Sequence, residues 1–277
     1  MTEAARRVRR ARRGDIPGIV AVLAANDESV GDADGPGSRY LEHVLRHGRA
    51  AVAERDGDVV GFGATVETPA GAFLTDLYVA PAEQGRGAGG ALLDRVWPAS
   101  GPRLTFSSDD PRALPLYVRG GMSAWWPLLY LVRTDVRSTV GPAGWGVEIV
   151  DGAAAARFER ELAGSDRSRD WALWASRPGN RAFVVRQGRR TVAVGYADGA
   201  DLGRLVLARG AEPVEAVLAT VALAPGGPLK DLAIPGPHPA VRPLLELGWR
   251  IDARDTFMAS EPDLLDPIRL LPDPSLG

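Results

Sequence analysis

A glycine-rich loop that follows an apolar stretch is the part of the sequence best suited to chemistry. The stretch Phe73–Val79 has the pattern of a strand, and the loop Gln84–Gly90 leads from it into a helical pattern that ends near Trp97. Backbone N–H groups at the start of a helix have no partner within the helix, and the helix dipole adds partial positive charge there. Glycines let phosphate groups approach such a backbone closely. The loop is therefore predicted to bind a pyrophosphate group.

A second motif, residues 110–122, contains the tyrosine Tyr117. Both motifs resemble signatures of the GNAT superfamily of N-acetyltransferases. Residues 84–89, Gln-Gly-Arg-Gly-Ala-Gly, match the pattern Gln/Arg-x-x-Gly-x-Gly/Ala, and the strand, turn and helix around them match as well. Residues 110–122 resemble the pattern Asn-x-x-Ala-x-x-x-Tyr-x-x-x-Gly-Phe, with Asp110 in place of Asn and Met122 in place of Phe. The resemblance covers the order of elements from Val8 to about Thr134.

This resemblance implies that acetyl-CoA is the cosubstrate and that its acetyl group passes directly to a primary amine of a small molecule or peptide. It implies that Tyr117 acts as the general acid that protonates the departing CoA thiolate. The change from Asn to Asp110 weakens one expected cofactor contact. The implied cofactor-binding residues are the main chain of Leu77, Tyr78 and Val79 for pantetheine, and Gln84, Gly85, Arg86, Gly87, Ala88, Gly89 and Gly90 for pyrophosphate.

Asp76 is the candidate for handling the amine. Strand alternation would place Asp76 on one face with Leu74 and Tyr78, where its carboxylate could attract or deprotonate an amine in an acceptor cleft. Glu67 is a weaker candidate of the same kind. From spacing alone, Tyr117 also fits a core position on an amphipathic helix, and Asp76 also fits a solvated or hydrogen-bonded carboxylate.

Two other functions fit parts of this sequence. The glycines 85, 87 and 90 match the Gly-x-Gly-x-x-Gly fingerprint of an NAD-dependent oxidoreductase, and Asp110 follows Gly90 by 20 residues, where an acidic residue could bind a ribose. In that fingerprint the first glycine stands directly at the end of a strand, whereas Pro81 to Gln84 intervene here. A non-catalytic acyl-CoA-binding module is the other alternative, since a fold does not establish activity. The presence of Tyr117 favours an enzyme over such a module.

Composition excludes several kinds of site. The chain has no cysteine, so disulfides, thiolate catalysis and thiolate zinc sites are excluded. His43 and His47 are four residues apart, but no third ligand accompanies them, and we expect no metal. A net charge of -2 favours neither nucleic acid nor membrane as a partner. The apolar run Ile19–Ala25 is short for an export signal, and no 18 consecutive residues are apolar. We therefore expect a cytoplasmic monomer or homodimer.

The second half of the chain repeats the first. Leu74–Ala80 aligns with Leu202–Ala208 at an offset of 128. A second match has an offset of 127 and aligns Ala113, Tyr117, Gly121 and Met122 with Ala240, Leu244, Gly248 and Trp249. The nearly constant offset predicts a tandem duplication of one α/β unit.

The second copy is predicted to have lost the site. Glu212, Glu215 and Val217 stand where Gln84, Gly87 and Gly89 stand in the first copy. Carboxylates there would repel a pyrophosphate, and the leucine in place of Tyr117 can transfer no proton.

The predicted fold is α/β (α+β): two tandem GNAT-like domains, each a mixed, mostly antiparallel sheet flanked by helices. The predicted boundaries are an acetyl-CoA-binding domain at residues 1–134, a linker at 135–146 and a degenerate domain at 147–277. The second domain is expected to pack against the first and shape the acceptor cleft.

Overall fold

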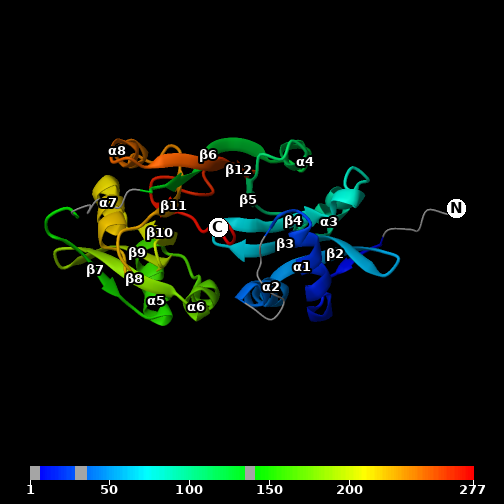
Figure 1. The fold of residues 1–277 in the computed structure, drawn as a ribbon, viewed down its shortest axis with the longest axis horizontal. Coiled ribbons are helices and arrows are strands. Elements are labelled where there is room, and N and C mark those ends of the chain that lie inside the picture. Colours follow the sequence, from blue (N-terminus) through cyan, green and yellow to red (C-terminus); the bar gives the residue numbers. More distant parts are fainter. Residues whose placement is uncertain (1–6, 29–35, 135–140) are drawn as a thin grey trace. The chain divides into compact units, whose positions relative to one another are not determined.

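The computed structural model describes residues 7–28, 36–134 and 141–277 (Figure 1). By its contacts the chain forms two compact units, unit 1 with residues 1–105 and Gly277, and unit 2 with residues 106–276. Residues 135–140 of the predicted linker lie outside the described residues. A strand begins at Trp145, within the stretch predicted as linker.

Unit 1 is built on a sheet in the order β1-β2-β3-β4-β5, antiparallel from β1 to β4 and parallel between β4 and β5. Asp56 and Gly57, both with positive φ (55° and 93°), form the two-residue turn that joins β2 to β3. The elements are β1 Arg7–Arg10, α1 Ile16–Ala24, α2 Pro36–His47, β2 Gly48–Arg55, β3 Asp58–Thr68, β4 Gly71–Val79, α3 Ala88–Val96 and β5 Arg103–Ser107.

Helices α2 and α3 cover opposite faces of this sheet. On the α3 face, a Cβ added to Gly61 or Gly63 would lie 3.1 or 3.3 Å from side-chain atoms of Leu92, so α3 sits close against β3. On the other face, Tyr40 of α2 donates a hydrogen bond to Asp76 of β4. These contacts fix the positions of β4 and of the first turn of α3 relative to each other.

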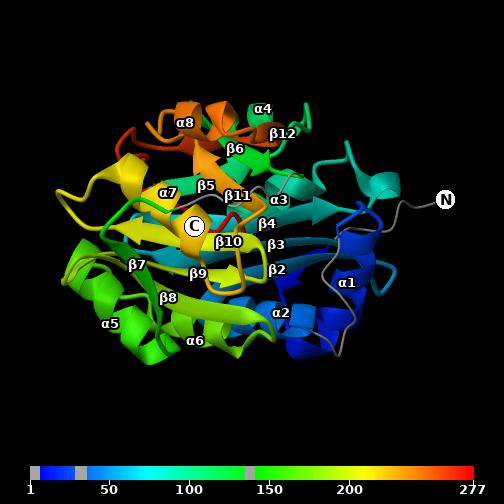
Figure 2. The same ribbon diagram turned by 60° about the vertical axis from the view of Figure 1, so that its left-hand side comes forward.

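Unit 2 contains a sheet in the order β12-β6-β11-β10-β9-β8-β7, with the short β13 paired to β10 (Figure 2). Its strands pair antiparallel except for β10 and β11. Its elements are α4 Ala113–Arg119, β6 Ser123–Val132, β7 Trp145–Ile149, α5 Gly152–Ala163, α6 Ser168–Ser176, β8 Asn180–Gln187, β9 Arg190–Asp198, β10 Asp201–Leu207, α7 Pro213–Leu223, β11 Asp231–Pro235, α8 Val241–Glu246, β12 Arg250–Ala259 and β13 Leu270–Leu271.

The order of elements confirms the predicted tandem repeat. From β7 to β12 the second half repeats the order from β1 to β6, strand, two helices, three strands, helix, strand, helix, strand. Strands β5 and β11 begin at Arg103 and Asp231, which preserves the offset of 128. The predicted fold class, a mixed and largely antiparallel sheet flanked by helices, is also confirmed.

Strand β6 belongs to the first repeat by sequence but to unit 2 by its contacts, so the compact units do not coincide with the repeats. By sequence it closes the first repeat, yet in unit 2 it pairs with both β11 and β12, with Leu131 opposite Leu232 and Ile251. Leu129 and Leu131 of β6 belong to the hydrophobic core of unit 2. The boundaries predicted at residues 134 and 147 separate the two sequence repeats. Whether they also separate two independently folding domains stays a prediction.

Candidate active site

Strands β4 and β5 pair only at their beginnings. The ladder joins Ala72 to Arg103 and Phe73 to Leu104, and the Thr105 hydroxyl donates to the Leu74 carbonyl at 2.9 Å. In the described part of unit 1 the ladder between β4 and β5 ends with these two residue pairs. The last residues of β4 consequently have a strand partner on one side only, β3.

The unpaired side of β4 presents backbone N–H groups. Ala80 donates its N–H to Val60 of β3 at 2.9 Å, so alternation points the N–H groups of Val79 and Leu77 away from β3. This is the geometry that an extended amide chain such as pantetheine needs in order to pair with a strand. The structure thus gives the predicted pantetheine residues a suitable edge.

A β-bulge at Thr75 corrects the predicted alternation of β4. Asp76 lies opposite Ala64 and Leu74 lies opposite Thr65, so Thr75 is the extra residue. The Thr65 hydroxyl donates to the Val96 carbonyl of α3, whereas Asp76 bonds to α2. Leu74 and Asp76 therefore lie on opposite faces, because a bulge shifts the alternation by one residue. Asp76 shares a face with Tyr78 but not with Leu74.

The loop after β4 has the backbone conformation expected of an anion site. Gly85 and Gly87 have φ of 73° and 83°, and a Cβ added at either would meet no atom within 4 Å. Helix α3 starts after Gly87, and its first internal hydrogen bond runs from Ala91 N–H to the Gly87 carbonyl. The preceding N–H groups of the first turn are thus left for a ligand. The loop is exposed at Gly85, Arg86 and Gly87, which leaves room for a diphosphate.

Gln84 and Arg86 have roles within the protein. The Gln84 side-chain amide donates to the Val79 carbonyl at 2.9 Å and to Asn26 at 3.1 Å, and Asn26 donates to the same carbonyl at 3.2 Å. Gln84 thereby fixes the junction between β4 and the loop. Arg86 lies 3.6 Å from buried Glu83, which also accepts a hydrogen bond from Arg55. The part played by Asn26 was not predicted, since nothing in its local sequence marks it.

Asp76 is a buried carboxylate held by two hydroxyl groups. Tyr40 and Thr75 each donate to its Oδ2 atom at 2.7 Å. Burial raises the pKa of Asp76 to about 6, against the opposing effect of the two hydrogen bonds. A carboxylate with this pKa exchanges protons near neutral pH, as a general base requires. Sequence reasoning missed Tyr40, because it precedes Asp76 by 36 residues and lies in a different element. Glu67, the weaker candidate, is exposed.

Tyr117 lies on the short helix α4 in unit 2 and is 7% exposed. Burial, together with the negative charges of Asp110 and Asp255, raises its pKa well above the ordinary value. The phenol therefore keeps its proton at neutral pH, and it makes no hydrogen bond to another described residue. Asp110 is engaged by the Arg112 side chain at 2.7 and 2.9 Å and by its N–H at 2.8 Å, contacts that lower the Asp110 pKa.

Comparison with known proteins finds a family match in the first half of the chain. Residues 46–121 match the model of the acetyltransferase (GNAT) domain, a range that includes Asp76, the glycine loop and Tyr117. This part of the chain is therefore similar to GNAT acetyltransferase domains. No curated protein matches the chain.

Solved structures extend the GNAT fold over the whole chain. A Pyrococcus horikoshii protein assigned as an acetyltransferase is 16% identical, with 100% of this chain and 97% of that chain covered and a TM-score of 0.76. A tandem GNAT protein from the clavulanic acid biosynthesis pathway is 18% identical over 94% of this chain and 100% of that chain, with a TM-score of 0.62. A GCN5-related N-acetyltransferase from Kribbella flavida is 17% identical over 93% and 71%, with a TM-score of 0.61. At these identities the likeness concerns the fold.

The alternatives to a GNAT site find little support. Strands β1 to β4 are antiparallel, whereas a dinucleotide-binding fold is built on a parallel sheet. The rings of His43 and His47 lie 4.9 Å apart, but among residues 7–28, 36–134 and 141–277 no group of three acidic, histidine or cysteine side chains could hold a metal ion. No helix in the same residues is long and apolar enough to cross a membrane.

The second repeat differs from the candidate site of the first at several corresponding positions. Helix α7 begins at Pro213 directly after Glu212, so no glycine loop precedes it. Glu215 lies in its first turn, and Val217 is fully buried. Arg204 takes the place of Asp76, again next to a bulge, and pairs with buried Glu159 at 2.9 Å.

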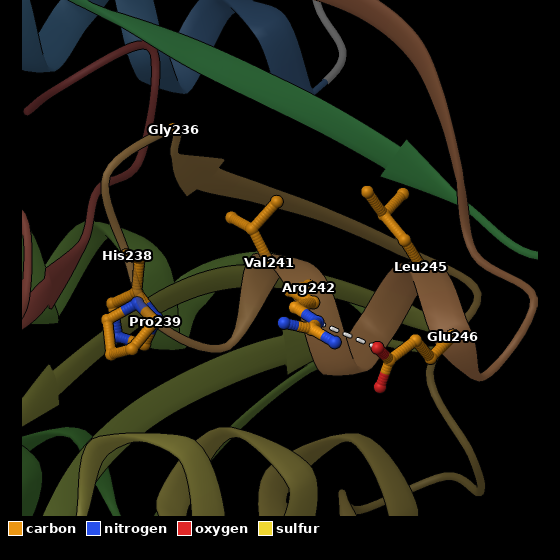
Figure 3. A pocket seen from close by; sticks show the side chains of 7 residues that line it. All are labelled: Gly236, His238, Pro239, Val241, Arg242, Leu245 and Glu246. Atoms are coloured by element: carbon orange, nitrogen blue, oxygen red, sulfur yellow. Dashed lines mark hydrogen bonds and ion pairs between the residues drawn. The ribbon is translucent and has the colours of Figure 1, made fainter.

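A shallow hollow of about 520 Å³ lies where β11 leads into α8 (Figure 3). Arg242 and Glu246 form an exposed ion pair of 2.8 Å along α8, and His238 and Pro239 line the opposite part. His238 accepts the Ala240 N–H through Nδ1, and burial lowers its pKa to about 4, so the ring is neutral at physiological pH. None of the predicted site residues lines this hollow.

Proposed function

We propose that the first repeat, residues 1–134, is an acetyl-CoA-dependent N-acetyltransferase that acts on a primary amine of a small molecule or peptide. The observation that carries this proposal is the continuity of β4 with the glycine loop. The N–H groups of Leu77 and Val79 lie on the side of β4 without a strand partner, and the same strand leads to the free N–H groups at the start of α3. An edge for an extended amide chain is thus followed by an anion site.

Each of these residues has one task in the proposal. Main-chain atoms of Leu77, Tyr78 and Val79 pair with pantetheine. The diphosphate is held by the loop N–H groups with Arg86 as a nearby cation, and Gln84 fixes the junction below them. The loop residues are Gln84, Gly85, Arg86, Gly87, Ala88, Gly89 and Gly90. Acetyl-CoA supplies the activated acetyl thioester.

Asp76 and Tyr117 handle the two protons of the reaction. Asp76 removes a proton from the ammonium form of the acceptor, which frees the nitrogen lone pair for attack on the thioester carbonyl. The new C–N bond forms as the C–S bond breaks, and Tyr117 gives its proton to the departing sulfur. The second proton lost by the nitrogen passes to solvent, from which the Tyr117 phenolate regains its own. Its raised pKa keeps that proton on the phenol until the thiolate develops. A chain without cysteine has no thiol to carry the acetyl group, which favours direct transfer.

A paired binding and turnover experiment tests the proposal. Calorimetric titration with acetyl-CoA should show one site per chain, and a panel of primary amines should include an acceptor that releases free CoA thiol. Acetyl-CoA binding without thiol release for any amine would instead support the non-catalytic acyl-CoA-binding alternative. Preference for NADH over acetyl-CoA in the same titration would refute the proposed cosubstrate.

A further inference from the structure

The second repeat keeps the geometry of the β4 edge but fills it with a segment of the chain itself. Strand β10 pairs with β11 only through Asp201 and Leu202, as β4 pairs with β5 only at its beginning. At the offset of 128, the residues of β10 that correspond to Leu77–Val79 are Leu205–Leu207. After these first residues, β4 and β10 therefore have the corresponding edge without a parallel strand partner.

Strand β13 occupies this edge in the second repeat. Leu271 lies opposite Leu205 and Leu270 lies opposite Val206 in an antiparallel ladder. Leu207, the counterpart of Val79, donates its N–H to the Arg269 carbonyl at 2.8 Å. The Ala208 N–H points the other way, to Val192 at 2.8 Å, just as Ala80 donates to Val60. The amide that is free of a strand partner in β4 is thus bonded in β10.

Side-chain contacts fasten the segment around this ladder. The Arg269 guanidinium donates to the Leu207 carbonyl at 2.9 Å and to the Leu162 carbonyl of α5 at 3.1 Å. The Leu207 carbonyl corresponds to that of Val79, which accepts from Gln84 in the first repeat. The ring of His238, from the loop before α8, lies beside the backbone of Ile268.

Farther along, the segment enters the interior of unit 2. Asp273 accepts hydrogen bonds from Trp174 at 2.8 Å and from Tyr196 at 2.5 Å. Arg167, 3% exposed, donates to the Leu276 carbonyl at 2.7 Å. Buried side chains of α6, of β9 and of the residue before α6 therefore each have a hydrogen-bond partner in this segment.

We propose that residues 266–276, the insert segment, are a permanent internal substitute for the pantetheine arm in the second repeat. The segment supplies the main-chain partners that a cofactor would supply to β10, and it closes the cleft between β10 and β11 to acyl-CoA. The second repeat is then held together by its own chain, independently of any cofactor. This inference rests on the proposed function in one respect, the use of the β4 edge by pantetheine.

Backbone amide exchange on the full chain, read by NMR at single residues, tests the inference. Without ligand, Leu205 and Leu207 should exchange slowly and Leu77 and Val79 rapidly, and acetyl-CoA should slow only the latter two. The variant Arg269→Ala should speed exchange at Leu207 by at least about tenfold through opening of the segment and leave Ala208, bonded on the other edge, unchanged.

Two further variants make the outcome decisive. Arg190→Ala removes a similar exposed bond, to the Arg209 carbonyl at 3.0 Å, and should not affect Leu207. Leu271→Pro removes an N–H from the ladder itself; if this variant does not fold, Arg269→Ala decides alone. Rapid exchange at Leu205 and Leu207 in the wild type, or protection that survives opening of the segment, would overturn the inference. Failure of acetyl-CoA to protect Val79 would instead count against the proposed function.

Discussion

Strands β4 and β10 hold corresponding places in the two repeats but differ along one edge, which pairs with β13 in β10 and has no such strand in β4. Both carry a bulge at the corresponding position, Thr75 and Gly203, and both separate from the next parallel strand after their first residues. After the bulge stands a carboxylate in one, Asp76, and a guanidinium in the other, Arg204. The bulge and the separation from the next parallel strand are common to both repeats and so belong to the fold. What each strand could bind depends on single side chains, such as Asp76 or Arg204, and on which segment lies along its edge.

The largest expected effect comes from exchanging Gly87 of the proposed phosphate loop with Glu215, its counterpart in the second repeat. Gly87→Glu should weaken acetyl-CoA binding by at least about 10³-fold, because a side chain at φ 83° is strained and its carboxylate faces the diphosphate. The reverse change, Glu215→Gly, should create no second site. Calorimetry measures both. Gly101→Glu is the matched control, since Gly101 also has positive φ and open space around it. Unchanged binding in Gly87→Glu would remove the loop from the site.

Next in size is the effect of breaking the ion pair that replaces Asp76. Arg204→Ala removes the guanidinium that bonds to buried Glu159 at 2.9 Å and should lower the free energy of unfolding by about 3–5 kcal/mol. Burial opposes ionisation of Glu159, yet Arg204 and Arg167 lower its pKa below the ordinary value, so the carboxylate is charged. Arg242→Ala breaks an exposed pair with Glu246 and should have no measurable effect. Equal urea midpoints for both variants would contradict a structural role for Arg204.

The loss of the proposed general acid, Tyr117, should have a smaller effect. Tyr117→Phe should reduce kcat by about 10²-fold and leave acetyl-CoA affinity nearly unchanged, because a phenylalanine retains the packing but cannot donate a proton. Tyr130→Phe, which removes a hydroxyl bonded to Asp255 at 2.7 Å, serves as the control. Steady-state kinetics with an identified acceptor provides the measurement. A fall confined to affinity, or wild-type turnover, would show that Tyr117 is a core tyrosine.

The smallest expected effect is a displacement of the pH profile. Tyr40→Phe removes a hydrogen bond that stabilises the ionised form of Asp76, so the pKa should rise further above about 6. Since a general base acts in its ionised form, activity falls as pH drops through that pKa. The acid limb of kcat/KM should therefore move to higher pH, by about one unit. Asp76→Asn should remove the limb altogether. An unchanged limb in Tyr40→Phe would exclude Asp76 as the titrating group.

Local patterns in the sequence predicted the elements but not their partners. Spacing and glycine positions predicted the strand at 73–79, the helix after the loop, the order of elements and the tandem repeat. The bulge at Thr75 escaped prediction because a bulge depends on the pairing of two strands, and neither strand encodes it alone. The contact of Tyr40 with Asp76 escaped prediction for the same reason, since it joins elements that are distant along the chain.

The second repeat shows the same limit. Alignment of the two repeats at a fixed offset showed that the glycines and the tyrosine are replaced in the second repeat. The degenerate site was predicted on that basis. The insert segment was not predicted, because residues 266–276 lie beyond the repeated elements and have no counterpart among the described elements of the first repeat. A pair of leucines between prolines gives no periodic signal for a strand.

The position of β6 has a consequence for biosynthesis. Because translation proceeds from residue 1, β6 leaves the ribosome about a hundred residues before β11 and β12, its two partners in unit 2. During that interval both of its edges are unsatisfied, and its sequence of tryptophan, leucine and tyrosine favours aggregation. A chain stopped near Gly141 should therefore form inclusion bodies, and coexpression with residues 142–277 should rescue its solubility. We therefore expect that the first repeat does not fold as a separate chain.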